Sequence, residues 1–216
     1  MLNYVKSIQT QAFQVWLSES MQELGWQYPG VDLAGYVLPC EGWADMPQLI
    51  RAETWPPEQQ PKAIAYFCGA MLTPEGPLNP ADPQFPIAQT EQVKTASVRF
   101  LRQNVGQLWP KALDANGRFR WELLIDAGKA EGEMRFASQF WRANVDPSER
   151  YVLAVPESDQ YRLKAHDEAG YDNLYLTGDW IDCGFNVGCV EAAVMAGLQA
   201  ASAITGDPKL TDIVGH

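Results

Sequence analysis

The sequence predicts an α+β fold: a mixed β-sheet with helices, followed by a separate strand–turn–helix element. Apolar residues make up 46% of the 216 residues, which is enough for a substantial buried core. Up to about residue 165, strand-like runs do not alternate regularly with helices, which argues against a doubly wound parallel sheet. From residue 166 the pattern changes to one strand, one glycine-bearing turn and one helix. We therefore expect two regions, residues 1–165 and residues 166–216.

Three segments of the first region have clear patterns. Apolar and polar side chains alternate over residues 8–17, which predicts a half-buried strand. The run AIAYFCGAM at residues 63–71 is continuously apolar and is expected as a central strand. Residues 87–109 have apolar side chains at helical spacing, and Pro110 ends this helix. We also expect strands near residues 35–38, 120–126 and 151–155, a short helix capped by Asp45, a loop over residues 73–86 and a turn over residues 144–150.

Charge and composition exclude several classes of function. The formal net charge is −11, so no basic surface for nucleic acid or for an anionic membrane is expected. The amino terminus lacks the pattern of a secretory signal, and no run of about 18 apolar residues predicts a membrane-spanning helix. The 4 cysteines form no CxxC pair and only 2 histidines occur, so no metal site is expected. These features favour a cytoplasmic protein with reduced thiols.

The second region contains the candidate chemistry. Residues 173–180 read as a short strand that ends in Gly178-Asp179, and a loop over residues 181–188 leads into a helix over residues 189–204. The free N–H groups at the start of a helix attract an anion, and an aspartate at a strand end can accept hydrogen bonds from hydroxyl groups. Such a unit suits a nucleotide with a polyol and a phosphate. The alternative is that Asp179 caps a turn and the glycines only permit close packing.

The helix over residues 189–204 is rich in alanine. Val190, Val194, Leu198 and Ala201 fall on one of its faces, which predicts a buried helix.

The run from Tyr171 to Gly197, with its flanks, resembles the carboxy-terminal flavin-binding signature of the amine oxidase and phytoene desaturase superfamily. The Gly-Asp-Trp sequence at residues 178–180 is more similar to the carotenoid desaturases than to the monoamine oxidases. The residues that match this signature are Gly178, Asp179, Gly184, Gly188, Glu191, Ala193 and Gly197.

The resemblance implies FAD as the cofactor and a role for each loop residue. Asp179 would bond to the ribityl or pyrophosphate part of FAD, and the backbone of residues 186–188 would face the ribityl chain and the flavin ring edge. Glu191 would lie in the first turn of the helix, with or without a ligand. The expected cofactor-binding residues are Gly178, Asp179, Gly184, Phe185, Asn186, Val187, Gly188 and Glu191.

The resemblance also assigns the two regions. Residues 1–165 would be a substrate-binding domain, and residues 166–216 would be the carboxy-terminal strand–turn–helix of a Rossmann-like FAD-binding domain. Enzymes of this superfamily begin with a strand followed by GxGxxG, which this sequence lacks. We therefore expect the amino-terminal half of the FAD-binding domain to be missing, and to be supplied in cis or by a separate chain.

The expected activity is dehydrogenation of a C–N or C–C bond in a small-molecule substrate, with hydride transfer to the flavin. One alternative is a non-catalytic assembly subunit that pairs with a separate flavin-binding chain, and another is a stand-alone domain with a small apolar ligand. No catalytic residue is identified. Arg162 could orient a polar substrate or form an ion pair, while His166 reads as a solvated loop residue and Cys183 as an unreactive small side chain.

Overall fold

The computed structural model describes residues 3–71, 82–166 and 170–215, so residues 73–81 of the expected loop lie outside the described part. The chain divides into two units. One comprises Gln9–Glu149, and the other combines Met1–Ile8 with Arg150–His216. This grouping puts residues 150–165 in the same unit as the carboxy-terminal helix, whereas they were expected to belong to the substrate-binding region. The division at residue 165 stays a prediction.

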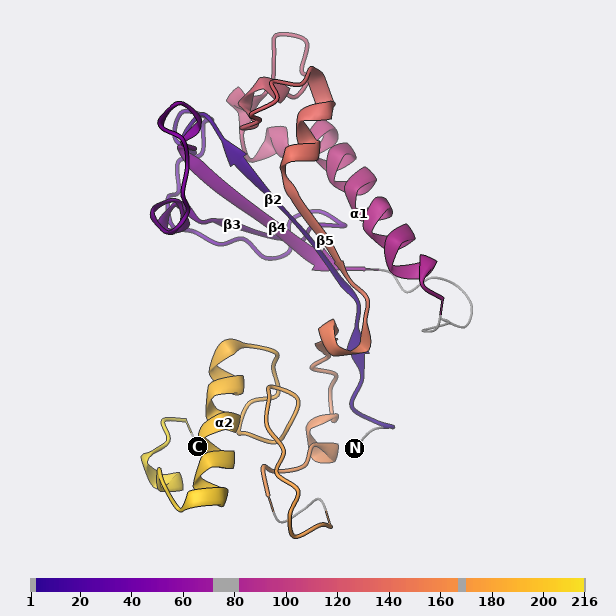
Figure 1. Cartoon of the computed structure of the whole chain (residues 1–216), viewed down its shortest axis with the longest axis vertical. Helices are drawn as coiled ribbons and strands as arrows, with labels where there is room; N and C mark the ends of the chain where they lie inside the picture. The colour runs from indigo at the N-terminus through magenta and orange to yellow at the C-terminus, as the bar shows by residue number, and fades with distance from the viewer. Residues whose placement is uncertain (1–2, 72–81, 167–169, 216) are drawn as a thin grey trace. The chain divides into compact units, whose positions relative to one another are not determined.

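The unit Gln9–Glu149 is built on a four-stranded sheet (Figure 1). Its strands lie in the order β3-β4-β2-β5, and each neighbouring pair is antiparallel. The predicted combination of a sheet with helices is confirmed, but the sheet is antiparallel where a mixed one was expected. The strands are β2 (Thr10–Leu17), β3 (Gly42–Asp45), β4 (Ala63–Ala70) and β5 (Phe140–Asn144).

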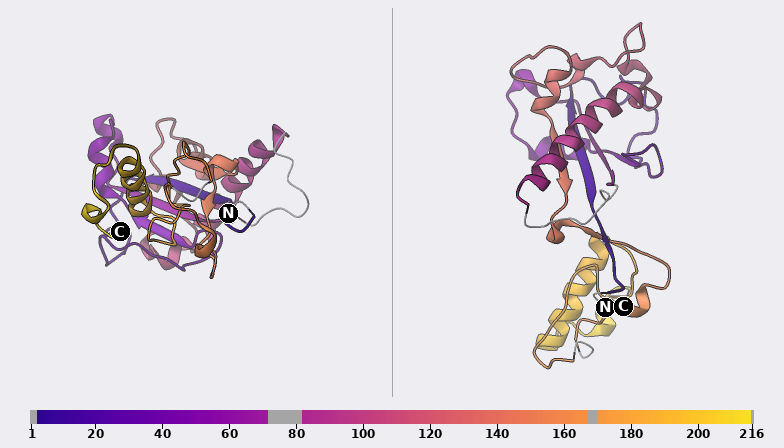
Figure 2. Two further views of the ribbon diagram at one scale, coloured as in Figure 1. Left: turned by 90° about the horizontal axis from the view of Figure 1, so that it is seen from below. Right: turned by 90° about the vertical axis from the view of Figure 1, so that its right-hand side faces the viewer.

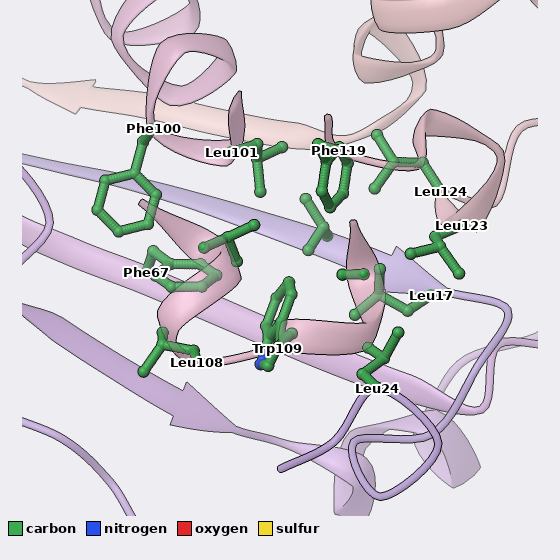
Figure 3. Close-up of a cluster of buried hydrophobic side chains, with 14 of the residues drawn as sticks. Leu17, Leu24, Phe67, Phe100, Leu101, Leu108, Trp109, Phe119, Leu123 and Leu124 are labelled. Carbon is green, nitrogen blue, oxygen red and sulfur yellow. The ribbon is translucent and has the colours of Figure 1, made fainter. Parts of the chain in front are cut away.

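Helix α1 (Gln84–Gln103) packs against β5 and β2 on one face of this sheet, as Figures 1 and 2 show. The core between them combines aromatic rings with leucine side chains (Figure 3). Phe13 and Phe67 are direct partners across β2 and β4, and their rings stack with centroids 4.7 Å apart. Phe100 of α1 meets Phe67 edge-on at 5.2 Å. In β2, Phe13, Val15 and Leu17 are buried, whereas Gln14 and Trp16 between them are only partly buried. This alternation confirms the half-buried strand predicted over residues 8–17.

The long elements confirm the sequence predictions, whereas several short ones correct them. The apolar run at residues 63–71 forms the central strand β4. The helix expected at residues 87–109 is confirmed as α1, but α1 begins at Gln84, inside the expected loop, and ends at Gln103. The 3₁₀ helix η3 (Val105–Gln107) lies between α1 and Pro110, so Pro110 does not end the helix. Near residues 35–38 there is only an isolated bridge between Val37 and Cys40. Asp45 ends strand β3 instead of capping an α-helix, and the 3₁₀ helix η1 (Pro47–Ala52) follows it.

The strand predicted near residues 120–126 is wrong, because the 3₁₀ helix η5 (Trp121–Leu123) occupies this position. Leu123 and Leu124 are both fully buried. In a strand, successive side chains point to opposite faces, so both would be buried only if the strand lay between two layers. The turn expected at residues 144–150 contains the 3₁₀ helix η7 (Pro147–Glu149). Strand β5 was not predicted from the sequence.

The second unit has little regular structure. The two-residue strands β1 (Ser7–Ile8) and β6 (Tyr151–Val152) pair in antiparallel fashion, and the strand expected at residues 151–155 is confirmed only over β6. The main element is helix α2 (Val190–Thr205), which confirms the helix predicted at residues 189–204. Its inner face joins a small core with Ile181, Cys183 and Ile213. Among the residues that the structure describes, no helix has the length and apolar character needed to cross a membrane.

Candidate functional site

The strand expected at residues 173–180 is not formed. This segment is irregular, and two backbone hydrogen bonds, one from it and one from the loop that follows, join this part of the chain to residues 163–165. Leu176 N–H donates to the Ala165 carbonyl at 2.8 Å, and Asp182 N–H donates to the Leu163 carbonyl at 2.9 Å. Two isolated bonds do not make a ladder, since a strand needs a regularly paired neighbour. Gly178 and Asp179 therefore lie in a loop held by the preceding segment.

The backbone turns sharply at Gly178, whose φ of +113° favours glycine over any residue with a side chain. Asp179 follows directly and is half-buried. Its carbonyl accepts a hydrogen bond of 2.8 Å from Nη1 of Arg162. Its carboxylate lies against the backbone of Gly188, because a Cβ on that glycine would be 3.2 Å from Asp179 Oδ2. The loop therefore brings Asp179 back to the start of α2.

The start of α2 is capped by Cys189, whose Sγ accepts a hydrogen bond from the Ala192 N–H at 3.4 Å. Glu191 lies in the first turn and is exposed, where a carboxylate is stabilised by the helix dipole. The buried Gln199 donates to the Cys183 carbonyl at 3.0 Å and so ties the loop to the helix. The helix start and the Asp179 loop thus form one locally connected arrangement.

The tip of the loop combines exposed apolar side chains with a polar atom that has no partner. Phe185 and Val187 are exposed, while Oδ1 of Asn186 is buried and accepts no hydrogen bond from the described residues. A buried acceptor of this kind usually has a partner, so it indicates a missing donor. Together with the close approach at Gly188, these residues fit a ligand that has hydroxyl groups and an apolar ring. Gly184 also belongs to this loop and has a φ of +106°.

Three residues considered outside the predicted cofactor set are also located. Cys183 is fully buried, and His166 stacks on Tyr175 with ring centroids 4.7 Å apart. Arg162 is only 4% exposed, and its Nε and Nη2 atoms have no hydrogen-bond partner among the described residues. No carboxylate of the described residues forms a salt bridge with it, so the expected ion pair is not formed. The sequence pattern gave no signal of this burial.

The outer face of α2 corrects another prediction. Val190, Val194 and Leu198 were expected to be buried, but they are 76%, 54% and 38% exposed. The buried residues lie on the opposite face, where Ala192 and Ala196 contact the small core. Both faces of α2 are therefore apolar, although the described residues of this unit cover only one of them.

Comparison with protein families gives a match to this part of the chain. Residues 121–205 match the family described as flavin containing amine oxidoreductase, which confirms the resemblance over this segment. The matched segment ends at the last residue of α2 and includes every residue of the predicted cofactor set. No curated protein and no solved structure matches the chain significantly.

Proposed function

We propose that this chain, which matches the flavin containing amine oxidoreductase family over residues 121–205, supplies the substrate-binding domain and the carboxy-terminal flavin element of an FAD-dependent oxidoreductase. The observation that carries this proposal is the position of Asp179 against Gly188 at the start of α2, inside the matched segment. The reaction would be dehydrogenation of a C–N or C–C bond. Bound flavin would supply the hydride acceptor.

The loop residues would divide the binding of FAD between them. The Asp179 carboxylate would accept hydrogen bonds from ribityl hydroxyl groups, and Asn186 Oδ1 would accept another. Phe185 and Val187 would provide apolar contact with the ring system, since both are exposed. The proposed cofactor set is completed by the loop glycines and the first helical turn: Gly178, Gly184, Gly188 and Glu191.

The unit Gln9–Glu149 would bind the substrate. Gln14 and Tyr66 are cross-strand partners on β2 and β4, and they alternate with the core residues Phe13 and Phe67. They therefore lie on the sheet face away from the aromatic core. Phe140, on β5, pairs with Gln14 and is exposed. This face combines polar and aromatic groups, which is typical of a surface that orients a small molecule.

A second candidate is a non-catalytic assembly subunit that pairs with a separate flavin-binding chain. The exposed apolar face of α2 favours it, because Val190, Val194 and Leu198 would be buried by such a partner. The sequence contains no GxGxxG for the ADP half of a dinucleotide. In either case the dinucleotide-binding half would come from elsewhere, in cis or in trans.

Flavin retention by the purified chain tests the first proposal. The chain is mixed with FAD and passed through a gel-filtration column, and the visible flavin absorbance that elutes with protein is measured. We expect retention by the wild type, strong loss in Asp179→Ala and retention in Asp182→Ala. Asp182 is a matched control because it is exposed and its hydrogen bond to the Leu163 carbonyl comes from its backbone N–H.

The other outcomes separate the two candidates. If the wild type retains flavin only after a dinucleotide-binding chain is added, this chain carries half of the flavin site, and substrate oxidation by the complex then separates the enzyme part from the non-catalytic subunit. If the chain retains no flavin in either condition, both candidates are contradicted. Equal retention by the Asp179→Ala and Asp182→Ala variants would remove Asp179 from the site and would contradict the proposed binding mode.

A further inference from the structure

Arg162 is a buried cation that uses only part of its hydrogen-bonding capacity. It follows the 3₁₀ helix η8 (Asp159–Tyr161), whose Tyr161 stacks on Tyr4 at 4.1 Å. The Arg162 side chain is 4% exposed, and Nη1 donates to the Asp179 carbonyl at 2.8 Å. The Nε and Nη2 atoms are buried and have no partner among the described residues.

The chemistry of the guanidinium makes this arrangement costly for the ligand-free chain. An arginine side chain stays protonated in proteins, and burying a charge without a counter-charge is strongly unfavourable. No acidic side chain of the described residues lies within salt-bridge distance of Arg162. A negative group from outside these residues would remove the penalty.

The two free donors also fix the shape of that group. Nε and Nη2 lie on one edge of the planar guanidinium, which binds two oxygens of one phosphate or carboxylate side by side. Ser158 lies four residues earlier, and its hydroxyl is likewise buried without a partner among the described residues. The opposite edge is anchored through Nη1 to Asp179, the residue that contacts Gly188 at the start of α2.

We propose that the Nε–Nη2 edge of Arg162 binds a phosphate group, and that this phosphate is part of the flavin nucleotide. The assignment to the flavin rests on the proposed function, whereas the anion-binding role rests on the burial and missing partners of Arg162. A phosphate of a different ligand would have the same chemistry. Arg162 is thus an anion-binding residue that lies outside the loop of residues 178–188.

Binding of three flavins and of pyrophosphate distinguishes these sources. Riboflavin, FMN and FAD share the ring and the ribityl chain, but only FMN and FAD contain phosphate. Their affinities are measured by quenching of flavin fluorescence for the wild type, Arg162→Gln, Arg162→Lys and the control Lys209→Gln. Thermal unfolding with and without inorganic pyrophosphate is measured on the same four proteins. Lys209 is exposed, so its variant removes one positive charge elsewhere.

We expect Arg162→Gln to weaken FMN and FAD binding by about 10- to 100-fold, the range for a lost hydrogen bond to a charged group. Riboflavin affinity should be unchanged. Pyrophosphate should raise the unfolding temperature of the wild type and of Lys209→Gln, but not that of Arg162→Gln. Arg162→Lys keeps the charge without the two-donor edge, so it should be intermediate. The ligand-free Arg162→Gln variant should unfold at the same temperature as the wild type or higher, because an unpaired buried charge is removed.

Several results would overturn the proposal. A pyrophosphate effect of equal size in the wild type and in Arg162→Gln, or no such effect in either, would show that Arg162 binds no phosphate. An equal loss of riboflavin and FMN affinity would make Arg162 a structural contact of Asp179. Arg162 would also be a structural contact if the Arg162→Gln chain does not fold and the Arg162→Lys chain responds to pyrophosphate like the wild type. If the wild type binds no flavin but its pyrophosphate effect depends on Arg162, the proposed function is wrong while the anion site stands.

Discussion

Gly188 brings its backbone so close to Asp179 that a Cβ at this position would lie 3.2 Å from the Asp179 Oδ2 atom. This contact joins the loop after Gly178 to the first turn of α2. The distance from a methyl group there to the carboxylate would be shorter than most van der Waals contacts, so the carboxylate would have to move. The position of the Asp179 carboxylate therefore depends on the absence of a side chain at residue 188.

We predict that Gly188→Ala weakens flavin binding by about tenfold, which corresponds to the loss of one hydrogen bond of about 1.4 kcal/mol. Fluorescence quenching in an FAD titration measures this effect. Gly197→Ala is the matched control, since its Cβ would be 3.9 Å from the nearest atom, Oγ1 of Thr177. The control should bind flavin normally and gain about 1 kcal/mol of stability, because alanine favours a helix interior over glycine. Equal flavin affinity in the two variants would contradict the role given to Gly188.

A second prediction concerns the two apolar faces of α2. Val194→Asp changes a side chain that is 54% exposed, so it should alter the stability of the chain by less than about 1 kcal/mol. Ala196→Asp instead buries a carboxylate in the small core and should unfold this unit. Circular dichroism during thermal unfolding compares the two variants.

The same pair of variants tests what the exposed face does. If a dinucleotide-binding half covers it, Val194→Asp should abolish complementation of flavin binding by that half while the variant itself stays folded. Normal complementation by Val194→Asp would show that this face of α2 is not the contact surface.

The sequence predicted well those elements whose pattern is set within one segment. The alternation in β2, the continuous apolar run of β4 and the helical spacing of α1 are each encoded locally. Strand β5 was missed because its sequence, FWRAN, has no regular alternation and is fixed by pairing with the distant β2. Asp45 was expected to cap an α-helix, although β3 is determined by its pairing with β4.

For the candidate site, the sequence predicted the motif residues but not their surroundings. The glycines and Asp179 were predicted as cofactor-binding residues from their motif, and this role stays a prediction; the structure adds that Asp179 contacts Gly188. The exposed face of α2 could not be found, because its periodicity indicates an apolar face and does not say what covers it. The burial of Arg162 likewise gave no sequence signal, since the burial of an arginine depends on the tertiary structure around it.

A third prediction addresses the aromatic core between the sheet and α1. Phe67 is fully buried, stacks on Phe13 and meets Phe100 edge-on, so its truncation removes contacts on several sides. Phe67→Ala should cost about 3–5 kcal/mol of unfolding free energy. Urea denaturation of the chain measures this loss. Phe140→Ala is the control because Phe140 is exposed, and a loss of similar size in both variants would argue against the packing described for β4.

The last prediction is a pH dependence at Asp45, the final residue of β3. Burial, with a smaller contribution from the nearby Asp32 charge, raises the pKa of the Asp45 carboxyl above its ordinary value. Its Oδ1 atom is buried without a hydrogen-bond partner among the described residues. Since the pKa is higher in the folded than in the unfolded chain, ionisation of Asp45 disfavours folding. The penalty is absent below the unfolded pKa of about 3.9 and is complete above the folded pKa.

Asp45→Asn removes the charge and keeps the shape of the side chain. The variant should therefore have a higher unfolding temperature than the wild type at neutral pH, and this advantage should disappear at a pH of about 3, where Asp45 is protonated in both states. Thermal unfolding of both proteins at the two pH values measures the difference. An advantage of the same size at both values would mean that it comes from the amide group and not from the lost charge, because only the charge contribution changes with pH.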